Sequence, residues 1–450
     1  MHRTLSKLSH STPFILRRTY AASSTLIKPV TKLTHPDADV PAGTLKKVQE
    51  YSKYTVNTYA RPDLVMSHGK GCQLFDTNGR SYLDFTAGIA VNALGHSDPE
   101  VAQVLFDQAN KLVHTSNLYH HENAGELAKA LVETTRQHGG TWASKLFLAN
   151  SGTEANEGAL KFARKWGKHV SGSEKHEIVS FSNAFHGRSM GALSVTYNPK
   201  YQKPFAPLIP GIKTTPFNDI HAALEAITEK TCGVIIEPIQ GEGGVHPANA
   251  EFLQALRQRC NETNSLLIFD EIQCGLGRTG KMWGHQHFDK DCVPDVLTMA
   301  KPLANGVPIG AILTSEKIGE LIKLGDHGTT FGGNPLASAV ALNVVGRITS
   351  PEFLAKVNEK GEFLKSLLSQ VQQEHPDLIK EVRGKGLLIG VEFTKDPSPI
   401  VKMARERGLL LTTAGCNTVR VIPPLIISEE EAVEGVSRFA GAVQQMASSA

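Results

Sequence analysis

Between residues 145 and 315, short runs of hydrophobic residues alternate with longer segments whose apolar positions recur every three or four residues. Several runs are apolar throughout, which is typical of strands covered on both faces. In one longer segment the periodicity places Ala155, Ala159, Phe162 and Trp166 on one face of a helix. This alternation predicts an α/β domain built on a mostly parallel sheet. The expected strands are KLFLA (145–149), EIVSF (177–181), GVIIE (233–237), LLIFD (266–270), VLTMA (296–300) and GAILT (310–314).

After about residue 340 the pattern becomes that of a smaller α+β unit. Residues 353–373 and 428–446 have the spacing of long amphipathic helices, the second begun by Ser428, and residues 386–393 have a strand pattern. The predicted divisions are a leader at 1–36, an N-terminal segment at 37–95 that packs with the small domain, a large domain at 96–340 and a small C-terminal domain at 341–450.

Composition narrows the classes of function. The chain has 450 residues and a net charge of only +3, so its composition gives no reason to expect a nucleic-acid partner. No apolar run approaches the roughly 18 residues that a membrane-spanning helix needs. The six cysteines are dispersed without metal-ligand spacing, which favours a reducing compartment and predicts no metal site.

Residues 1–36 differ from the rest of the chain. They are basic and rich in Ser and Thr, and no acidic residue precedes Asp37. This composition is typical of a mitochondrial transit peptide, which predicts a protein of the mitochondrial matrix. The segment RRTYAA (17–22) suggests cleavage near Tyr20 and Ala21. The alternative is a disordered basic tail.

Polar side chains follow most of the expected strands. Because ligands bind beyond the carboxyl ends of strands in open α/β sheets, these side chains should lie along one edge. Together they offer a glycine and hydroxyl cup, an aromatic ring, an arginine, two carboxylates and a lysine. In chain order they are Asn150-Ser151-Gly152-Thr153, Phe185-His186-Gly187-Arg188, Glu237, Asp270 and Lys301.

The cup suits an anion. Ser151 and Glu154 have the spacing of a capping box at the start of a helix. Gly152 leaves backbone N–H groups uncovered at that helix N-terminus, where a phosphate is favoured. Taken alone, the motif is also consistent with an ordinary helix cap.

Lys301 and Asp270 add a more specific requirement. A lysine at the end of a buried strand is unusual, and loss of water would lower its pKa and prepare it for a Schiff base. A buried carboxylate such as Asp270 should face a cation. Pyridoxal phosphate has a phosphate, an aldehyde that condenses with lysine and a ring nitrogen that is cationic when protonated, so it would satisfy all three groups.

A dinucleotide-binding motif is the competing interpretation. Gly275, Gly277 and Gly280 match the pattern G-x-G-x-x-G. However, these glycines begin five residues past the strand, and no amphipathic helix follows them. We therefore interpret GLGRTG (275–280) as a surface loop rather than as evidence for a nicotinamide-dependent oxidoreductase.

Several motifs resemble those of the class-III, or ω-amino-acid, aminotransferases, over nearly the whole chain after the leader. The resemblance implies a homodimer of fold-type I pyridoxal-phosphate-dependent transferases, with a large domain and a smaller α+β domain. The motifs are LANSGTEANEGALKFAR, FHGR, IIEPIQGEGG, LLIFDEIQCGLGRTG, TMAKPLANGVPIGA and HGTTFGGNPLA.

The resemblance also implies roles for individual residues. Lys301 would bind the cofactor covalently and act in catalysis together with Asp270, which would pair with the ring nitrogen. Gly152 and Thr153 would hold the phosphate, Phe185 would stack on the ring, Gln273 would lie near the ring hydroxyl and Thr330 would reach the neighbouring subunit's phosphate. The implied substrate contacts are Arg188 with the α-carboxylate, Thr329 near the neighbouring subunit's substrate, Glu237 and Arg420 as a pair that switches between an ion pair and carboxylate binding, and Tyr59.

The implied reaction transfers a terminal amino group to 2-oxoglutarate by a two-step exchange, leaving a semialdehyde and glutamate. Within the family, FTAGIAVNALGH, SNLYHHENAGELAKAL and VRGKGLLIGVEF favour N2-acetyl-L-ornithine as the donor. Ornithine and other ω-amines are the alternative donors. A homologue without catalytic activity is not favoured, because both Lys301 and Asp270 are present.

Overall fold

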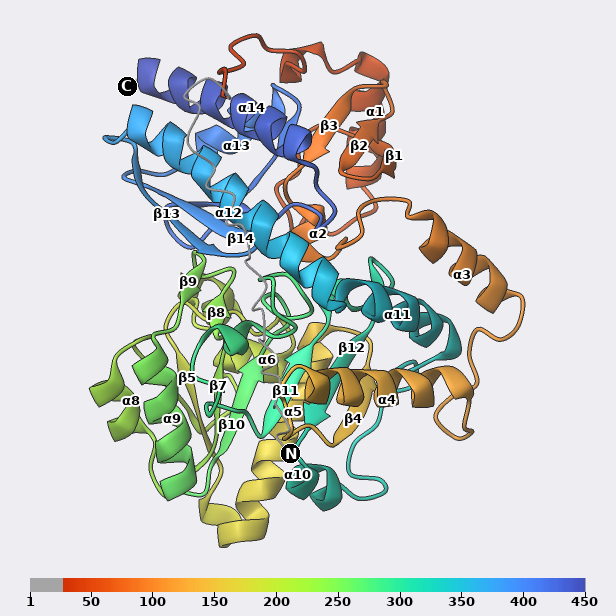
Figure 1. The fold of residues 1–450 in the computed structure, drawn as a ribbon, viewed down its shortest axis with the longest axis vertical. Coiled ribbons are helices and arrows are strands. Elements are labelled where there is room, and N and C mark those ends of the chain that lie inside the picture. Colours follow the sequence, from red (N-terminus) through yellow and green to blue (C-terminus); the bar gives the residue numbers. More distant parts are fainter. Residues whose placement is uncertain (1–26, 450) are drawn as a thin grey trace, which may run out of the picture.

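The computed structural model describes residues 27–449, and a seven-stranded sheet lies at its centre (Figure 1). All six expected strands are present in this sheet, joined by β6 at one edge, so the predicted strands are confirmed. Glu237 and Ala300 lie just beyond the strands that were expected to include them. In spatial order the strands are β4 (Lys145–Ala149), β12 (Gly310–Thr314), β11 (Val296–Met299), β10 (Leu266–Asp270), β7 (Thr231–Ile236), β5 (Glu177–Phe181) and β6 (Ile212–Thr215).

The sheet is mostly parallel, as predicted, and β12 is its exception. It runs antiparallel to both of its neighbours, β11 and β4. The connection from β11 to β12 contains only a short 3₁₀ helix, Lys301–Ala304, whereas a parallel crossover needs a dozen or more residues. As a result, β12 begins at the edge where its neighbours end.

Helices cover both faces of the sheet (Figure 1). On one face α5 (Gly152–Ser171) buries Ala155, Ala159 and Phe162 against apolar residues of the central strands, so the predicted helical face is confirmed except that Trp166 is only half-buried. On the other face α8 (Ile220–Ala226) and α9 (Ala250–Glu262) pack on the alternate residues of the same strands.

The C-terminal part contains the two long helices and the strand that the spacing predicted. They are α12 (Pro351–Glu374), α14 (Glu429–Ser448) and β14 (Leu388–Phe393). Ser428 caps α14 in a capping box with Glu431, which confirms the predicted start of that helix. The sheet around β14 has the order β13 (Ile379–Lys385), β14, β17 (Thr418–Val421) and β16 (Thr412–Ala414).

The N-terminal strands form a third sheet with a strand from the C-terminal part. β3 pairs in parallel with β15 (Leu409–Leu410), which joins residues far apart in the sequence. This pairing is consistent with the predicted packing of residues 37–95 on the small domain, and the domain boundaries themselves stay a prediction. The other strands of this sheet are β1 (Met66–Lys70), β2 (Gln73–Asp76) and β3 (Ser81–Asp84).

Shorter elements complete the chain, and in the part that the structure describes no helix is long and apolar enough to span a membrane. The remaining helices and strands are α1 (Ala42–Ser52), α2 (Ala87–Ala90), α3 (Pro99–Ala109), α4 (Glu122–Gln137), α6 (Met190–Val195), α7 (Pro199–Gln202), β8 (Ile239–Gln240), β9 (His246–Pro247), α10 (Glu316–Leu321), α11 (Pro335–Ile348) and α13 (Ser398–Arg405).

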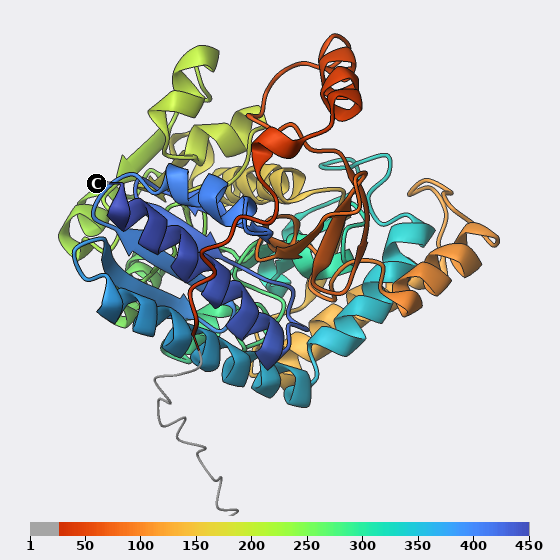
Figure 2. The ribbon, with the colours of Figure 1, turned by 90° about the horizontal axis from the view of Figure 1, so that it is seen from above.

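The end of the predicted leader belongs to the fold. The Val30 N–H donates to the carbonyl oxygen of Ser437 on α14 at 2.9 Å, and the Arg407 guanidinium donates to the Val30 carbonyl at 2.7 Å. In Figure 2 this first described stretch, in dark red, lies over the blue C-terminal helices. Residues 27–36, which the predicted leader includes, are therefore part of the fold, because their backbone groups have specific partners. Residues 1–26, with the expected cleavage site, lie outside the described residues.

The segment GLGRTG is buried, so the prediction of a surface loop was wrong. Gly277 and Gly280 have φ values of 84° and 79°, a conformation that favours glycine. A Cβ on Gly277 would lie 2.9 Å from the Ile348 carbonyl oxygen. The buried Arg278 side chain donates to the carbonyl oxygens of Leu387 and Pro423. Close packing against the C-terminal part therefore accounts for these glycines.

The docking of residues 27–36 can be tested at Gly441 of α14. A Cβ there would overlap the Val30 carbonyl oxygen, so Gly441→Ala should lower the melting temperature, although alanine favours helices. The matched control is Gly346→Ala in α11, where a Cβ meets nothing within 4 Å. The control should be neutral or stabilise by about 1 kcal/mol or less. Equal melting temperatures for the two variants would contradict this docking.

Candidate active site

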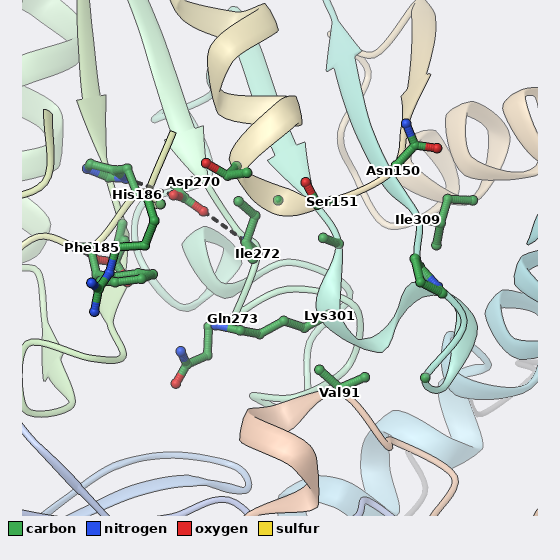
Figure 3. A pocket seen from close by; sticks show the side chains of 18 of the residues that line it. Val91, Asn150, Ser151, Phe185, His186, Asp270, Ile272, Gln273, Lys301 and Ile309 are labelled. Carbon is green, nitrogen blue, oxygen red and sulfur yellow. Dashed lines mark hydrogen bonds and ion pairs between the residues drawn. The ribbon is translucent and has the colours of Figure 1, made fainter. Parts of the chain in front are cut away.

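A cavity of about 460 Å³ lies where β4, β5, β7, β10 and β11 end and β12 begins. Figure 3 shows side chains from separate strands and turns converging on it. The predicted residues that line it are Asn150, Ser151, Gly152, Thr153, Phe185, His186, Gly187, Arg188, Glu237, Asp270, Gln273 and Lys301. The hydrophobic lining, which the sequence analysis did not identify, is Val91, Ile272, Val307, Pro308 and Ile309.

The N-terminus of α5 forms one wall. The Ser151 hydroxyl accepts a hydrogen bond from the Glu154 N–H at 3.3 Å, as a helix cap does. The Glu154 carboxylate accepts from the backbone N–H of Asn150 at 2.6 Å, so the reciprocal bond of the predicted capping box is shifted by one residue. A Cβ on Gly152 would lie 2.8 Å from the Ile272 side chain, so this position requires glycine. The free N–H groups and the helix dipole favour an anion here.

Asp270 ends β10 with only 3% of its surface exposed. One carboxylate oxygen accepts from the Asn156 amide at 2.8 Å and contacts the His186 ring nitrogen Nδ1 at 2.7 Å. The other accepts from the Ile272 N–H at 3.0 Å (Figure 3). The Thr298 hydroxyl donates to Asn156 at 2.7 Å and orients it. Each of these contacts fixes the direction in which the carboxylate points.

The roles of Asn156 and His186 at Asp270 were not predicted from the sequence. Asn156 lies on α5, three residues after Thr153, the last residue of the cup. It is a fully buried polar residue among alanines, and His186 follows a strand end in FHGR. Buried polar residues need hydrogen-bonding partners, so a polar residue at a position predicted to be buried could have been identified from the sequence as a candidate for the site.

Lys301 follows β11, and its side chain extends across the cavity (Figure 3). Burial, and after it the positive charge of Arg420, lower the pKa of Lys301 to about 8. Burial also raises the pKa of Glu237 to about 7. The Glu237 carboxylate accepts from the backbone N–H groups of Phe185 and Gly241, both at 3.0 Å.

Arg420 pairs with Glu242 instead of Glu237. The Arg420 side chain, 1% exposed on β17, donates to Glu242 at 2.8 Å and to the Gln273 side chain at 2.9 Å. The predicted partner was therefore wrong for this conformation. IIEPIQGEGG contains two glutamates. The first, in the cavity wall, accepts from backbone N–H groups, and the turn that follows directs the second toward β17.

Arg188 lies at the mouth of the cavity. Its guanidinium carbon is 3.5 Å from the ring centroid of Tyr201 and 5.7 Å from that of Phe185. The charged group is exposed, so it is available to an anionic substrate group while the aromatic rings hold it in place. Tyr201 was not identified in the sequence analysis.

Arg420 is not among the residues that line the cavity, and three other predicted contacts also lie outside it. Tyr59 is 68% exposed and lines a separate cavity, so its expected contact with substrate stays a prediction. The Thr329 hydroxyl accepts from the Asn150 amide at 2.9 Å. Thr330 is exposed, and its expected contact with a neighbouring subunit stays a prediction.

The fold and the cavity together define a class of enzyme. A lysine and a hydrogen-bonded aspartate at the carboxyl edge of a mostly parallel sheet, beside a helix N-terminus, form the site of a fold-type I pyridoxal-phosphate-dependent transferase. Residues 54–443 match the family model "Aminotransferase class-III". The chain belongs to the class-III aminotransferases, as its motifs predicted.

Individual proteins resemble this chain over most of its length. A protein of Yarrowia lipolytica named mitochondrial acetylornithine aminotransferase is 54% identical, with 89% of this chain and 98% of that protein covered. The crystal structure of ornithine aminotransferase from Toxoplasma gondii has a TM-score of 0.85 at 31% identity, covering 92% and 97%. That of N-acetylornithine aminotransferase from Stenotrophomonas maltophilia has a TM-score of 0.76 at 35% identity, covering 89% and 100%.

Pyridoxal phosphate is the cofactor of this family, and the residues present fit it. The buried Asp270 carboxylate has three hydrogen-bonding partners, and among residues 27–449 no lysine or arginine forms an ion pair with it. A protonated ring nitrogen would supply the positive charge. The Gly152 cradle would hold the phosphate, and the Lys301 amine would form the covalent bond. When bound, the cofactor supplies an electron sink for the substrate carbon.

The pKa of Lys301 predicts how cofactor loading depends on pH. With a pKa of about 8, about a tenth of the amine is neutral at pH 7, against less than about a thousandth for an ordinary lysine. When cofactor is added to the cofactor-free protein, the yellow absorbance of the covalent form should therefore appear faster as pH rises and level off above about pH 8. Stopped-flow absorbance measures this rate.

Variants identify the lysine responsible. Lys301→Ala should show no yellow absorbance and no bond that borohydride traps, whereas the exposed-site control Lys281→Ala should behave as wild type. Covalent trapping in Lys301→Ala, or a loading rate that still rises steeply to pH 10, would show that another amine is used.

Proposed function

We propose that this enzyme transfers the terminal amino group of N2-acetyl-L-ornithine to 2-oxoglutarate. The products are N-acetylglutamate 5-semialdehyde and L-glutamate, a reaction of arginine biosynthesis. The observation that carries the proposal is the cavity in which Lys301, Asp270 and Arg188 meet. The relative from Yarrowia lipolytica, 54% identical, supports the choice of donor. Ornithine is the second candidate donor, because a structural relative at 31% identity is an ornithine aminotransferase.

Lys301 has two tasks in this reaction. Its amine would hold the cofactor covalently and, when free, would take a proton from the donor carbon that bears the terminal amine. Because its pKa is lowered to about 8, it is a general base near neutral pH and can return the proton. Asp270, held by Asn156 and His186, keeps a negative charge directed into the cavity.

Two arginines would recognise the substrate carboxylates. Arg188, exposed beside Tyr201, binds the α-carboxylate of the donor, a task suited to a planar guanidinium. Arg420 is neutralised by Glu242 while the donor is bound. When 2-oxoglutarate or glutamate enters, Arg420 leaves Glu242 and binds the second carboxylate. The two half-reactions can then use one cavity.

We also propose a homodimer with shared active sites. Thr330, exposed at its own surface, reaches the phosphate bound by the partner, and Thr329 lies near the partner's substrate. The position of both residues on an exposed loop supports this. Sedimentation of an active enzyme at the mass of one chain would contradict it.

The proposed location is the mitochondrial matrix. The relative from Yarrowia lipolytica is named mitochondrial, and residues 1–36 have the composition of a transit peptide. Deletion of residues 1–20 should leave an active enzyme in the cytosol, as measured by cell fractionation. Import of the shortened protein into mitochondria would show that the targeting signal lies elsewhere.

A substrate panel tests the proposed donor. With 2-oxoglutarate as acceptor, kcat/KM for N2-acetyl-L-ornithine should exceed that for ornithine by about a hundredfold or more, because a site that hydrogen-bonds a polar group of its substrate can reject an analogue without that group by about 10⁴. Production of the semialdehyde and glutamate measures both rates. A higher kcat/KM for ornithine would contradict the proposal and favour the second candidate.

A further inference from the structure

A second, smaller cavity of about 250 Å³ borders the active site, with Phe185 lining both. Tyr201, on which the Arg188 guanidinium stacks at 3.5 Å, also lines it. Its lining also includes Glu242, the partner of Arg420, and the turn that contains Cys416. The cavity therefore lies beside the group that we assign to the donor's α-carboxylate.

The turn with Cys416 is held firmly in place. The Gly415 N–H donates to the Glu242 carbonyl oxygen at 2.7 Å, and Gly415 has a φ of 58°. A Cβ at Gly415 would lie 2.7 Å from the Gly243 carbonyl oxygen, so only glycine allows this approach. This packing fixes the backbone next to Cys416, whose side chain lines the cavity.

The lining of this cavity suits a neutral polar group. Neither the Asn183 amide nor the Tyr201 hydroxyl has a hydrogen-bond partner among residues 27–449, so both can bond to a ligand. Glu242 is the one carboxylate among the described lining residues, and Arg420 already neutralises it at 2.8 Å. A free ammonium group would find no unpaired negative charge here, whereas an amide would find neutral donors and acceptors.

We propose that this second cavity is the acyl subsite, which binds the N2-acyl group of the amino donor. In an N2-acylated amino acid, the acyl nitrogen and the carboxylate are bonded to the same carbon. A donor whose carboxylate binds Arg188 therefore directs its acyl group into the cavity beside Tyr201, with the acyl methyl toward Cys416. This inference rests on the proposed function, and it identifies the residues that distinguish an acylated donor from free ornithine.

Filling the cavity tests the subsite. Cys416→Trp should raise KM for N2-acetyl-L-ornithine by about tenfold or more. The larger side chain would occupy the space of the acyl group, and a change of this size in a pocket typically alters substrate discrimination by that factor. KM for ornithine should change less than about twofold, since ornithine lacks the acyl group. Lys281→Trp is the matched control and should leave both values unchanged, because it adds the same bulk at an exposed position that lines neither cavity.

Protection of the thiol gives a second measurement on wild-type enzyme loaded with cofactor. Cys416 is exposed and the other five cysteines are buried, so iodoacetamide should modify Cys416 first. N2-acetyl-L-norvaline, which keeps the carboxylate and acyl group but lacks the reacting amine, should slow this modification. Pentanoate, with a carboxylate but no acyl group, should not slow it at a concentration that inhibits catalysis equally. Peptide mass spectrometry measures the rates.

The outcomes separate the subsite from the proposed function. An enzyme that prefers N2-acetyl-L-ornithine, but in which Cys416→Trp changes KM for both donors equally or N2-acetyl-L-norvaline gives no protection, would overturn the subsite alone. A wild-type enzyme that uses ornithine but not N2-acetyl-L-ornithine would overturn the proposed function and the subsite with it.

Discussion

Asp270 ends a central strand with its carboxylate almost fully buried, and an ionised carboxylate there costs several kcal/mol unless it is hydrogen-bonded and paired with a cation. The chain supplies the hydrogen bonds from Asn156 and His186, which come from different elements, and from the backbone of Ile272. It leaves the side facing the cavity for a cationic ligand. The position of α5, the turn after β5 and the end of β10 must all be correct for this carboxylate to be stable.

The sheet brings the other groups to the same place. Strands that run in parallel end at one edge, so residues distant in the sequence, such as Thr153, Glu237 and Lys301, meet around one cavity. The reversed strand β12 adds Ile309 to the wall at the same edge, because its amino end lies there. Burial at this edge then sets the chemistry: it lowers the pKa of Lys301 and raises that of Glu237.

Sequence patterns predicted the strands, the main helices and most cavity residues. Apolar runs mark buried strands, and the residues that can bind a cofactor or a substrate follow the ends of those strands in the sequence. They did not predict details that depend on how turns fold. Glu237 and Glu242 lie in one motif, and only the turn between them decides which one meets Arg420. The burial of GLGRTG and the docking of Val30 depend on contacts with distant C-terminal residues, which local composition does not reveal.

Asp270 should keep the ring nitrogen of the bound cofactor protonated. Nuclear magnetic resonance of the enzyme loaded with cofactor labelled with ¹⁵N at the ring measures this protonation state. Wild type should show the chemical shift of a protonated nitrogen across the neutral pH range, and Asp270→Asn should show that of a neutral nitrogen. A neutral nitrogen in the wild-type enzyme, or a protonated one in the variant, would show that Asp270 does not have this role.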